Sequence, residues 1–262
     1  MLYPRIIPCL LVHKKGLYKT VKFKDHKYVG DPINAVKIFN EKEVDELIVL
    51  DIDASTHGYE PDYKMIENLA VECRMPLCYG GGIKTRAQAE RIFSLGVEKI
   101  ALSSAAVENF GVVSEIAGRV GNQSVVVVMD VKVTGSDGKY EIYTHNGSKP
   151  AGKNPVDFAI AMEKAGAGEI VVNSIDRDGV MKGYDLDLIQ QIWEVISVPM
   201  TVLGGAGSLE DIGAVIKRHG IIGAAAGSLF VFKGKFRAVL ISYPNRAEKE
   251  RLFNKMYCQN GL

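Results

Sequence analysis

Short runs of consecutive hydrophobic residues alternate along this chain with longer stretches in which hydrophobic positions recur at the helical period. Eight hydrophobic runs predict strands, at 5–12, 46–52, 76–80, 99–103, 124–131, 169–174, 199–204 and 223–227. Most are rich in Val and Ile and show no polar alternation, which is typical of strands buried on both faces. Amphipathic stretches between them predict helices, clearest at 31–44, 86–96, 154–166 and 209–220.

This succession of strand and helix units predicts an α/β fold, a single (β/α)8 TIM barrel over residues 1–262. An open doubly wound sheet is the alternative, but no G-x-G-x-x-G follows the first strand. The segment 133–148 is too long for a plain loop, and its part 136–145 predicts a small hairpin after the fifth strand. Residues 245–257 predict a closing helix.

Three motifs recur at a nearly constant offset of 124–125 residues. "LDIDAS" corresponds to "SIDRDG", "YGGGIKT" to "LGGAGSL", and "ALSSAA" to "AAAGSL". A constant offset across several motifs indicates an internal duplication. We therefore expect two similar half-barrels, at about 1–122 and 123–232.

The 262 residues are 47% hydrophobic and 24% charged, with a net charge of +1. This balance gives no reason to expect nucleic acid or a membrane as partner. The segment 13–28 is locally basic and predicts either a solvated loop or a lid over an anionic substrate. The chain has no leader-like start and no hydrophobic run long enough to span a bilayer.

The four cysteines show no metal-ligand spacing, so neither a metal nor a cofactor is expected; they are Cys9, Cys73, Cys78 and Cys258. Without secretory context they predict reduced thiols in a cytoplasmic protein. Cys9 and Cys78 lie in hydrophobic runs and are expected in the core.

Glycine-rich turns follow the third and seventh predicted strands, and small hydroxyl-bearing turns follow the fourth and eighth. Such turns bind phosphate through exposed backbone N–H groups, and in barrels they lie on the catalytic face. One predicted phosphate site comprises Gly82, Ser103 and Ser104, and a second comprises Gly205, Gly227 and Ser228. Two sites favour a ligand phosphorylated at both ends; the alternative is that the glycines only permit tight turns.

Carboxylates also stand at predicted strand ends, where general acid–base chemistry takes place in barrels. They are Asp51, Asp53, Asp130, Asp176 and Asp178. Asp130 is the strongest catalytic candidate because it ends the otherwise hydrophobic run "VVVVMD". The alternative for Asp176 and Asp178 is turn or cap chemistry within "IDRDG".

Ten motifs occur in order with near-constant spacing: "RIIPCL", "GDP", "DELIVLDI", "GGGI", "AAVEN", "VVVVMD", "GAGEI", "SIDRDG", "GYD" and "GGAG". Together they resemble the cyclase subunit of imidazole glycerol phosphate synthase, from Met1 to about Phe232. The resemblance implies a barrel of two half-barrels, a bisphosphate ligand, and a glutaminase subunit that docks at the barrel floor and supplies ammonia.

The resemblance also implies roles for particular residues at the barrel mouth. Of the family's two catalytic aspartates, one matches Asp130 and the other falls on Leu11, which cannot carry a proton. Lys19 matches a lysine near the phosphate, and Asp178 and Gly179 join the implied phosphate set. Two other positions at the mouth differ from the family: Asn173 stands where threonine is usual, and Leu203 replaces a small polar residue.

At the opposite end, this chain matches all four charged residues that gate the family's ammonia passage: Arg5, Glu46, Lys99 and Glu169. Each is expected to open a strand. The alternative is an ion-pair cluster that merely plugs the barrel. All four gate residues are present, whereas the catalytic aspartate at position 11 is lost. This combination favours a retained ammonia channel.

This combination, with the ending 232–250, resembles a divergent branch of the family associated with surface polysaccharides. There a sugar amidotransferase is thought to use the ammonia to turn an acetamido group of a nucleotide sugar into an acetamidino group. Two other functions stay open on the sequence: a working cyclase of histidine biosynthesis, and a non-catalytic phosphosugar-binding scaffold.

Overall fold

Eight parallel strands close into a barrel in the computed structural model, which describes residues 3–135 and 138–257. The barrel strands are β1 (Arg5–His13), β4 (Leu47–Asp51), β5 (Leu77–Gly80), β6 (Lys99–Leu102), β7 (Val125–Thr134), β10 (Glu169–Ser174), β11 (Met200–Leu203) and β12 (Gly223–Ala226). The ring closes because β12 pairs with β1 and β7 pairs with β10. The predicted (β/α)8 barrel is confirmed, and each predicted strand lies at its expected place.

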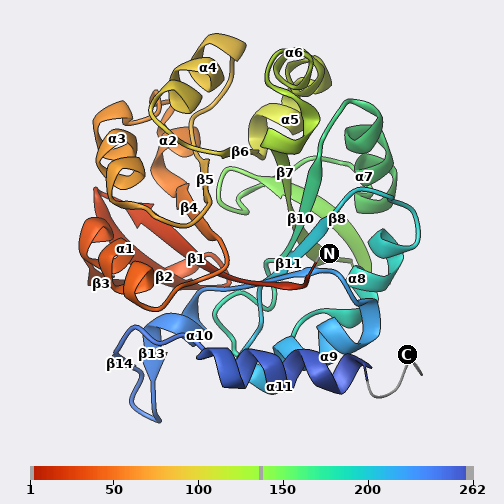
Figure 1. Ribbon diagram of the computed structural model, residues 1–262. Coiled ribbons are helices and arrows are strands. Elements are labelled where there is room, and N and C mark those ends of the chain that lie inside the picture. Colours follow the sequence, from red (N-terminus) through yellow and green to blue (C-terminus); the bar gives the residue numbers. More distant parts are fainter. Residues whose placement is uncertain (1–2, 136–137, 258–262) are drawn as a thin grey trace.

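Helices surround the barrel on its outside (Figure 1). They are α1 (Pro32–Glu41), α2 (Ile52–His57), α3 (Tyr63–Glu72), α4 (Arg86–Ser94), α5 (Ser104–Glu108), α6 (Phe110–Val120), α7 (Pro155–Lys164), α8 (Leu186–Trp193), α9 (Leu209–His219) and α10 (Ser228–Val231), with the short η1 (Asn122–Ser124) before β7. Several begin at a residue whose side chain accepts a hydrogen bond from the first turn, such as Asp31 for α1 and Asn154 for α7.

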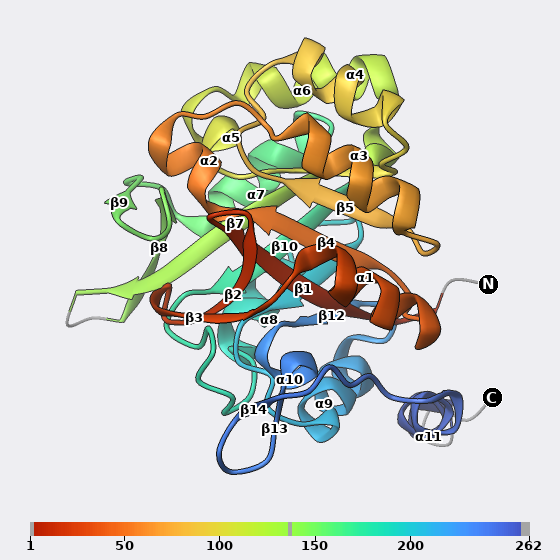
Figure 2. The same ribbon diagram turned by 90° about the vertical axis from the view of Figure 1, so that its left-hand side faces the viewer.

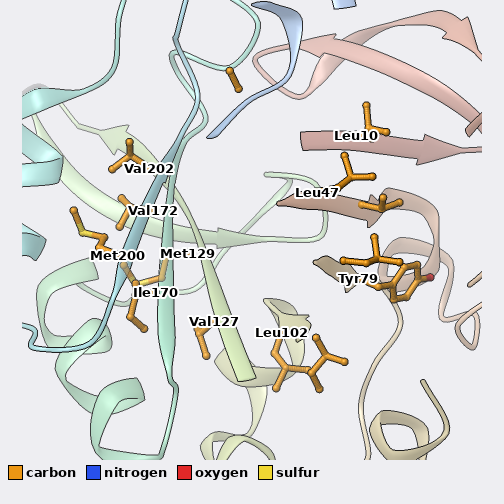
Figure 3. Packing of buried hydrophobic residues seen from close by; sticks show 14 of the residues in the cluster. Leu10, Leu47, Tyr79, Leu102, Val127, Met129, Ile170, Val172, Met200 and Val202 are labelled. Carbon is orange, nitrogen blue, oxygen red and sulfur yellow. The ribbon is translucent and has the colours of Figure 1, made fainter. Parts of the chain in front are cut away.

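Successive strand residues point alternately outward and inward, and the two sets form separate hydrophobic clusters. The outward set packs against the helices; Figure 3 shows part of it, including Leu10, Val127 and Val202. The inward set fills the barrel interior and contains Cys9 and Cys78, which are both buried. Cys258 lies outside the described residues.

Two hairpins project at the end of the barrel where the strands finish (Figure 2). The first, β2 (Gly16–Val21) and β3 (Lys24–Gly30), continues directly from β1. The basic segment is therefore mostly a hairpin and not a loop, because Leu11–His13 pair with Gly16–Tyr18. The second is formed by β8 (Lys139–Thr144) and β9 (Lys149–Pro150).

The predicted insertion after the fifth strand is larger than a separate small hairpin. β7 itself extends to Thr134 and pairs with β8 as far as Lys139, and β8 then pairs with β9. Residues 136 and 137 lie outside the described part of the chain. The long β7 thus carries one ribbon from the barrel wall to the mouth.

The chain after the barrel forms a short hairpin, β13 (Phe232–Lys233) and β14 (Ala238–Val239), followed by α11 (Arg246–Tyr257). α11 packs against α9 and lies at the end of the molecule opposite the mouth hairpins (Figure 2). The Tyr243 hydroxyl donates to the Ile6 carbonyl at 2.8 Å, which ties this tail to the barrel. Among the described residues, no helix is both long and apolar enough to cross a membrane.

Candidate functional site

A cavity opens at the carboxyl ends of the barrel strands, where active sites of barrels lie. The candidate residues that line it are Leu11, Lys19, Asp51, Gly82, Ser103, Ser104, Asp130, Asp178, Gly227 and Ser228. Gly179 and Gly205 are not among its lining residues. The structure thus brings most of the predicted mouth residues around one cavity.

Asp130 is one of three described carboxylates that line this cavity, together with Asp51 and Asp178. It accepts hydrogen bonds from Asn173 Nδ2 at 2.8 Å and from Ser103 Oγ at 3.4 Å. Burial raises the pKa of Asp130 to about 7, although these two donors favour the ionised form. A carboxyl group that titrates near neutrality is suited to transfer protons as an acid or as a base.

Asn173 holds this carboxylate in place. Its side chain is buried at 4% exposure, donates through Nδ2 to Asp130, and leaves Oδ1 without a partner among the described residues. Asn173, at the position where the resemblance implies threonine, therefore donates its side-chain N–H to Asp130.

Leu11 points into the cavity at the end of β1, beside Leu50 in the neighbouring strand. Leu203 lies in the same inward cluster. The position of the family's first aspartate is consequently hydrophobic, and the side chain at this position cannot exchange a proton, although Asp51 lines the cavity nearby.

Lys19 lies on β2 with only 5% of its surface exposed. Its Nζ donates to the Cys9 carbonyl at 2.5 Å. Burial lowers the pKa of Lys19, opposed by the neighbouring Cys9 and Asp178. A methyl group on Gly227 would lie 2.5 Å from Nζ, so the lysine would have to move aside if the glycine were replaced.

Asp178 and Gly179 support the first hairpin. The Asp178 carboxylate accepts from Thr20 Oγ1 at 2.6 Å and from the Phe23 amide at 3.3 Å. Gly179 has a φ of 66°, and a Cβ there would lie 2.0 Å from the Thr20 carbonyl oxygen. These contacts fix the β10–α8 loop against β2–β3 and leave the carboxylate already hydrogen-bonded.

Two predicted glycines serve close packing between loops. A Cβ on Gly205 would lie 2.2 Å from the Gly183 carbonyl oxygen, and one on Gly82 would lie 2.8 Å from that of Tyr59. Both have positive φ, 114° and 72° respectively. For Gly205 the tight-turn alternative accounts for the residue; Gly82 packs in this way and also lines the cavity.

Sequence reasoning missed the residues that the second hairpin brings to the mouth. His145 and Asn146, at the β8–β9 turn, line the cavity. The His145 amide donates to Ser104 Oγ at 3.4 Å, and Asn146 Nδ2 donates to the Ile52 carbonyl at 2.8 Å. The dipeptide Asn-Gly at 146–147 predicts a turn, but which loop the turn contacts depends on the tertiary fold.

Three other strand-end carboxylates have hydrogen-bond partners. Asp51 caps α2 by accepting from the amides of Asp53 and Ala54. Asp53 is hydrogen-bonded to His13 Nδ1 at 2.6 Å. Asp176 accepts from the Val133 amide on β7 at 2.8 Å, which is a contact between distant segments and not a bond within the turn "IDRDG".

The charged residues at the other end form a closed ring. Arg5 bonds to Glu46 and, at 2.8 Å, to Glu169, and Lys99 contacts both carboxylates at 2.9 Å. Burial opposes all these charges, yet the carboxylates raise the pKa of Lys99 and of Arg5, and Arg5 in turn lowers the pKa of Glu169. Arg5, Lys99 and Glu169 open their strands, whereas Glu46 stands one residue before β4.

Thr201 is a further member of this floor that sequence reasoning missed. Its hydroxyl donates to Glu169 Oε1 at 2.6 Å and lies 3.5 Å from Arg5 Nη2. It is fully buried in the hydrophobic run 199–204, and this isolated polar residue is the signal that could have revealed it. Gly223 makes room for it, because a Cβ there would clash with its hydroxyl.

Between floor and mouth the barrel interior is lined by hydrophobic side chains. The cluster comprises Ile7, Cys9, Ile48, Cys78, Ala101, Val126, Val128, Val171, Leu203 and Ala225, with Leu11 and Leu50 packed against it. The interior is therefore layered, with a charged floor, an apolar middle and a polar rim around Asp130.

Known proteins resemble the chain over almost its whole length. The family model for "Histidine biosynthesis protein" matches residues 5–237. A Vibrio vulnificus protein provisionally named imidazole glycerol phosphate synthase subunit hisF3 is 58% identical, covering 96% of both chains. A Leptospira interrogans protein, provisionally named subunit HisF, is 59% identical over 97% of this chain and 100% of its own. The Pseudomonas aeruginosa subunit hisF2, also provisionally named, is 54% identical over 94% and 97%.

The match spans the barrel, both mouth hairpins and the floor ring, and thus all the features that define the site. The chain belongs to the histidine biosynthesis protein family, among its HisF-like members.

Proposed function

We propose that this protein receives ammonia from a glutaminase subunit docked at the barrel floor and passes it through the barrel for amidation of another substrate. That substrate is proposed to be an N-acetylated nucleotide sugar of surface polysaccharide synthesis, whose acetamido group a sugar amidotransferase converts to an acetamidino group. The observation that carries the proposal is the complete floor ring beneath a mouth that has lost one carboxylate at Leu11.

The floor and the interior support passage of a small neutral molecule. Charges near an interior are tolerated when they are paired, and here each cation bridges both carboxylates. The hydrophobic side chains above them offer no site for ammonium, so the layering favours neutral ammonia. A barrel that needed only to be plugged could use hydrophobic residues throughout.

The mouth explains why the cyclase reaction itself is not the first choice. Removing a positioned acid or base typically slows a reaction by roughly 10²–10⁴-fold. Around Leu11 the cavity is hydrophobic, and Asp51 and Asp53 are held by a helix N-terminus and by His13. Asp51 also lines the cavity, but its Oδ1 already accepts hydrogen bonds from the Asp53 and Ala54 amides at the start of α2.

A working cyclase of histidine biosynthesis is the second candidate function. It is favoured by Asp130, whose pKa of about 7 suits proton transfer, and by the buried Lys19 beside Gly227. The provisional names of the relatives refer to the enzyme of this reaction, and they apply to the relatives themselves.

Cyclase turnover of the isolated protein separates the two candidates. The bisphosphate substrate of the family is supplied with excess ammonium at mildly alkaline pH, so that no glutaminase is required. We expect no measurable turnover by the parent protein and a gain of activity for Leu11→Asp, because only the variant carries both carboxylates. Asp130→Asn in the Leu11→Asp background serves as the control and is expected to abolish the gain.

Robust turnover by the parent would contradict the ammonia-transfer proposal and establish the cyclase. If the parent is inactive, the search turns to the acceptor: the protein is combined with a glutaminase and a sugar amidotransferase, and amidated sugar is measured per glutamine consumed.

A further inference from the structure

We propose that Arg237, at the base of the β13–β14 turn, binds a phosphate group of the ligand at Gly227 and Ser228, opposite Lys19. This inference goes beyond the proposed function, since it concerns a phosphate group bound at the mouth itself. It adds a binding group from the tail of the chain, just past the motifs that carry the family resemblance.

Arg237 is positioned directly over Ser228. Its Nη2 lies 3.5 Å from Ser228 Oγ and donates to the Gly179 carbonyl at 3.3 Å. Its Nε is buried and has no hydrogen-bond partner among the described residues. No carboxylate of the described chain forms a salt bridge with it, so the guanidinium retains both its charge and free donors.

Lys19 approaches the same backbone from another element. Its Nζ is so close to Gly227 that a Cβ there would lie 2.5 Å away. Two cations, one from β2 and one from the β13–β14 hairpin, thus flank two consecutive residues at the mouth cavity. The Lys19 ammonium is a compact positive charge, and the planar Arg237 guanidinium can donate two parallel hydrogen bonds. Together they are well suited to bind an oxyanion with several acceptor oxygens.

The hairpin holds Arg237 in this position. Lys27 Nζ donates to the Arg237 carbonyl at 3.2 Å. The Phe232 ring has Lys27 Nζ and the Arg237 guanidinium each 4.8 Å from its centre. Asp178 is the carboxylate on this side, and the three cations Lys19, Lys27 and Arg237 outnumber it, so the net positive charge favours a phosphate dianion.

Calorimetric titration with inorganic phosphate tests the assignment on the full-length protein. We expect Arg237→Gln to weaken phosphate binding roughly 10- to 100-fold, the effect of losing a charge-assisted hydrogen bond. Arg237→Lys is expected to lie between the two, because it keeps the charge and loses the fork. Lys235→Gln is the matched control, an exposed cation on the same hairpin, and should bind phosphate like the parent.

The possible results separate this inference from the proposed function. Phosphate binding by the parent that Lys19→Gln weakens and Arg237→Gln leaves unchanged would overturn the role of Arg237 alone. Absence of phosphate binding by the parent would overturn the phosphate site as a whole. Melting curves recorded without phosphate show whether each variant is folded. If Arg237→Gln is not folded, Arg237→Lys alone tests the assignment. Phosphate binding by Arg237→Lys equal to that of the parent would then overturn it.

Discussion

At the scale of single residues, the alternation along each strand decides which side chains can take part in the chemistry. Arg5, Ile7, Cys9 and Leu11 form one inward column on β1, from the charged floor to the mouth. On β7 the corresponding column ends at Asp130. Position 11 therefore has the orientation of a catalytic residue without its chemistry.

The buried Asp130 makes stability depend on pH. Its pKa is about 7 in the folded protein and near 3.9 in an unfolded chain. Between these values the folded protein keeps a proton that the unfolded chain has released, so stability is highest below pH 4 for this group and falls as pH rises to 7. Asp130→Asn removes this dependence, and its stability relative to the parent should rise by on the order of 2–4 kcal/mol between pH 4 and pH 8.

Urea unfolding of the parent and of Asp130→Asn at several pH values across this window measures the difference. Parallel stability curves for the two proteins would show that Asp130 titrates in its ordinary range.

At the scale of elements, the turns that surround the mouth depend on helix starts. Ser208 precedes α9, and its hydroxyl accepts from the Asp211 amide at 3.3 Å. The Asp211 carboxylate accepts in return from the amides of Gly207 at 2.9 Å and Ser208 at 3.1 Å. This capping box fixes the end of the "GGAG" turn.

Removing this cap should destabilise the protein measurably. Ser208→Ala is expected to lower the free energy of unfolding by about 1 kcal/mol, because it leaves helix N–H groups without an acceptor. Ser114→Ala, at an exposed position inside α6, is the control and should cost nothing. Equal midpoints in urea for Ser208→Ala and the parent would refute the role of the cap.

The elements themselves could be predicted from sequence because each barrel strand is a continuous hydrophobic run and each clear helix an amphipathic one. The β2–β3 hairpin could not, because "HKKGLYKTVKFKDHKY" is basic and half exposed, and its strand form depends on pairing with the end of β1. The place of Arg237 could not be predicted either, because its contact with the Gly179 carbonyl joins positions far apart in the chain.

At the scale of the whole molecule, the floor ring links the barrel to a glutaminase in our proposal. Lys99→Ala should lower the product formed per glutamine hydrolysed, because it opens one side of the ring while the main hydrophobic core stays intact. The measurement combines the variant with its glutaminase and the acceptor system. Lys164→Ala, an exposed change on α7, is the control.

Equal yield per glutamine for Lys99→Ala and the parent would remove the channel from the proposal. Circular dichroism before the assay separates the expected loss of yield from unfolding, since an interrupted ion-pair cluster leaves uncompensated charge near the interior.

The candidate site was predicted from sequence in part. The residues around the mouth cavity and the four floor charges lie where the motifs placed them, whereas Gly179 and Gly205 turned out to support loops. The roles of the phosphate and gate residues, and the division into two half-barrels, remain predictions. Local motifs specify which residue stands at a strand end; only the folded chain specifies which atoms it meets.

The separation of the barrel interior from the outer core has a consequence for how this protein could have diverged. Outward residues hold the helices on, while inward residues form their own smaller cluster. A substitution such as an acid for a leucine at the rim therefore changes the reaction without disturbing the packing that folds the chain. Descendants of one gene can lose a chemistry, and later regain it, by single replacements on a scaffold that natural selection keeps for other reasons.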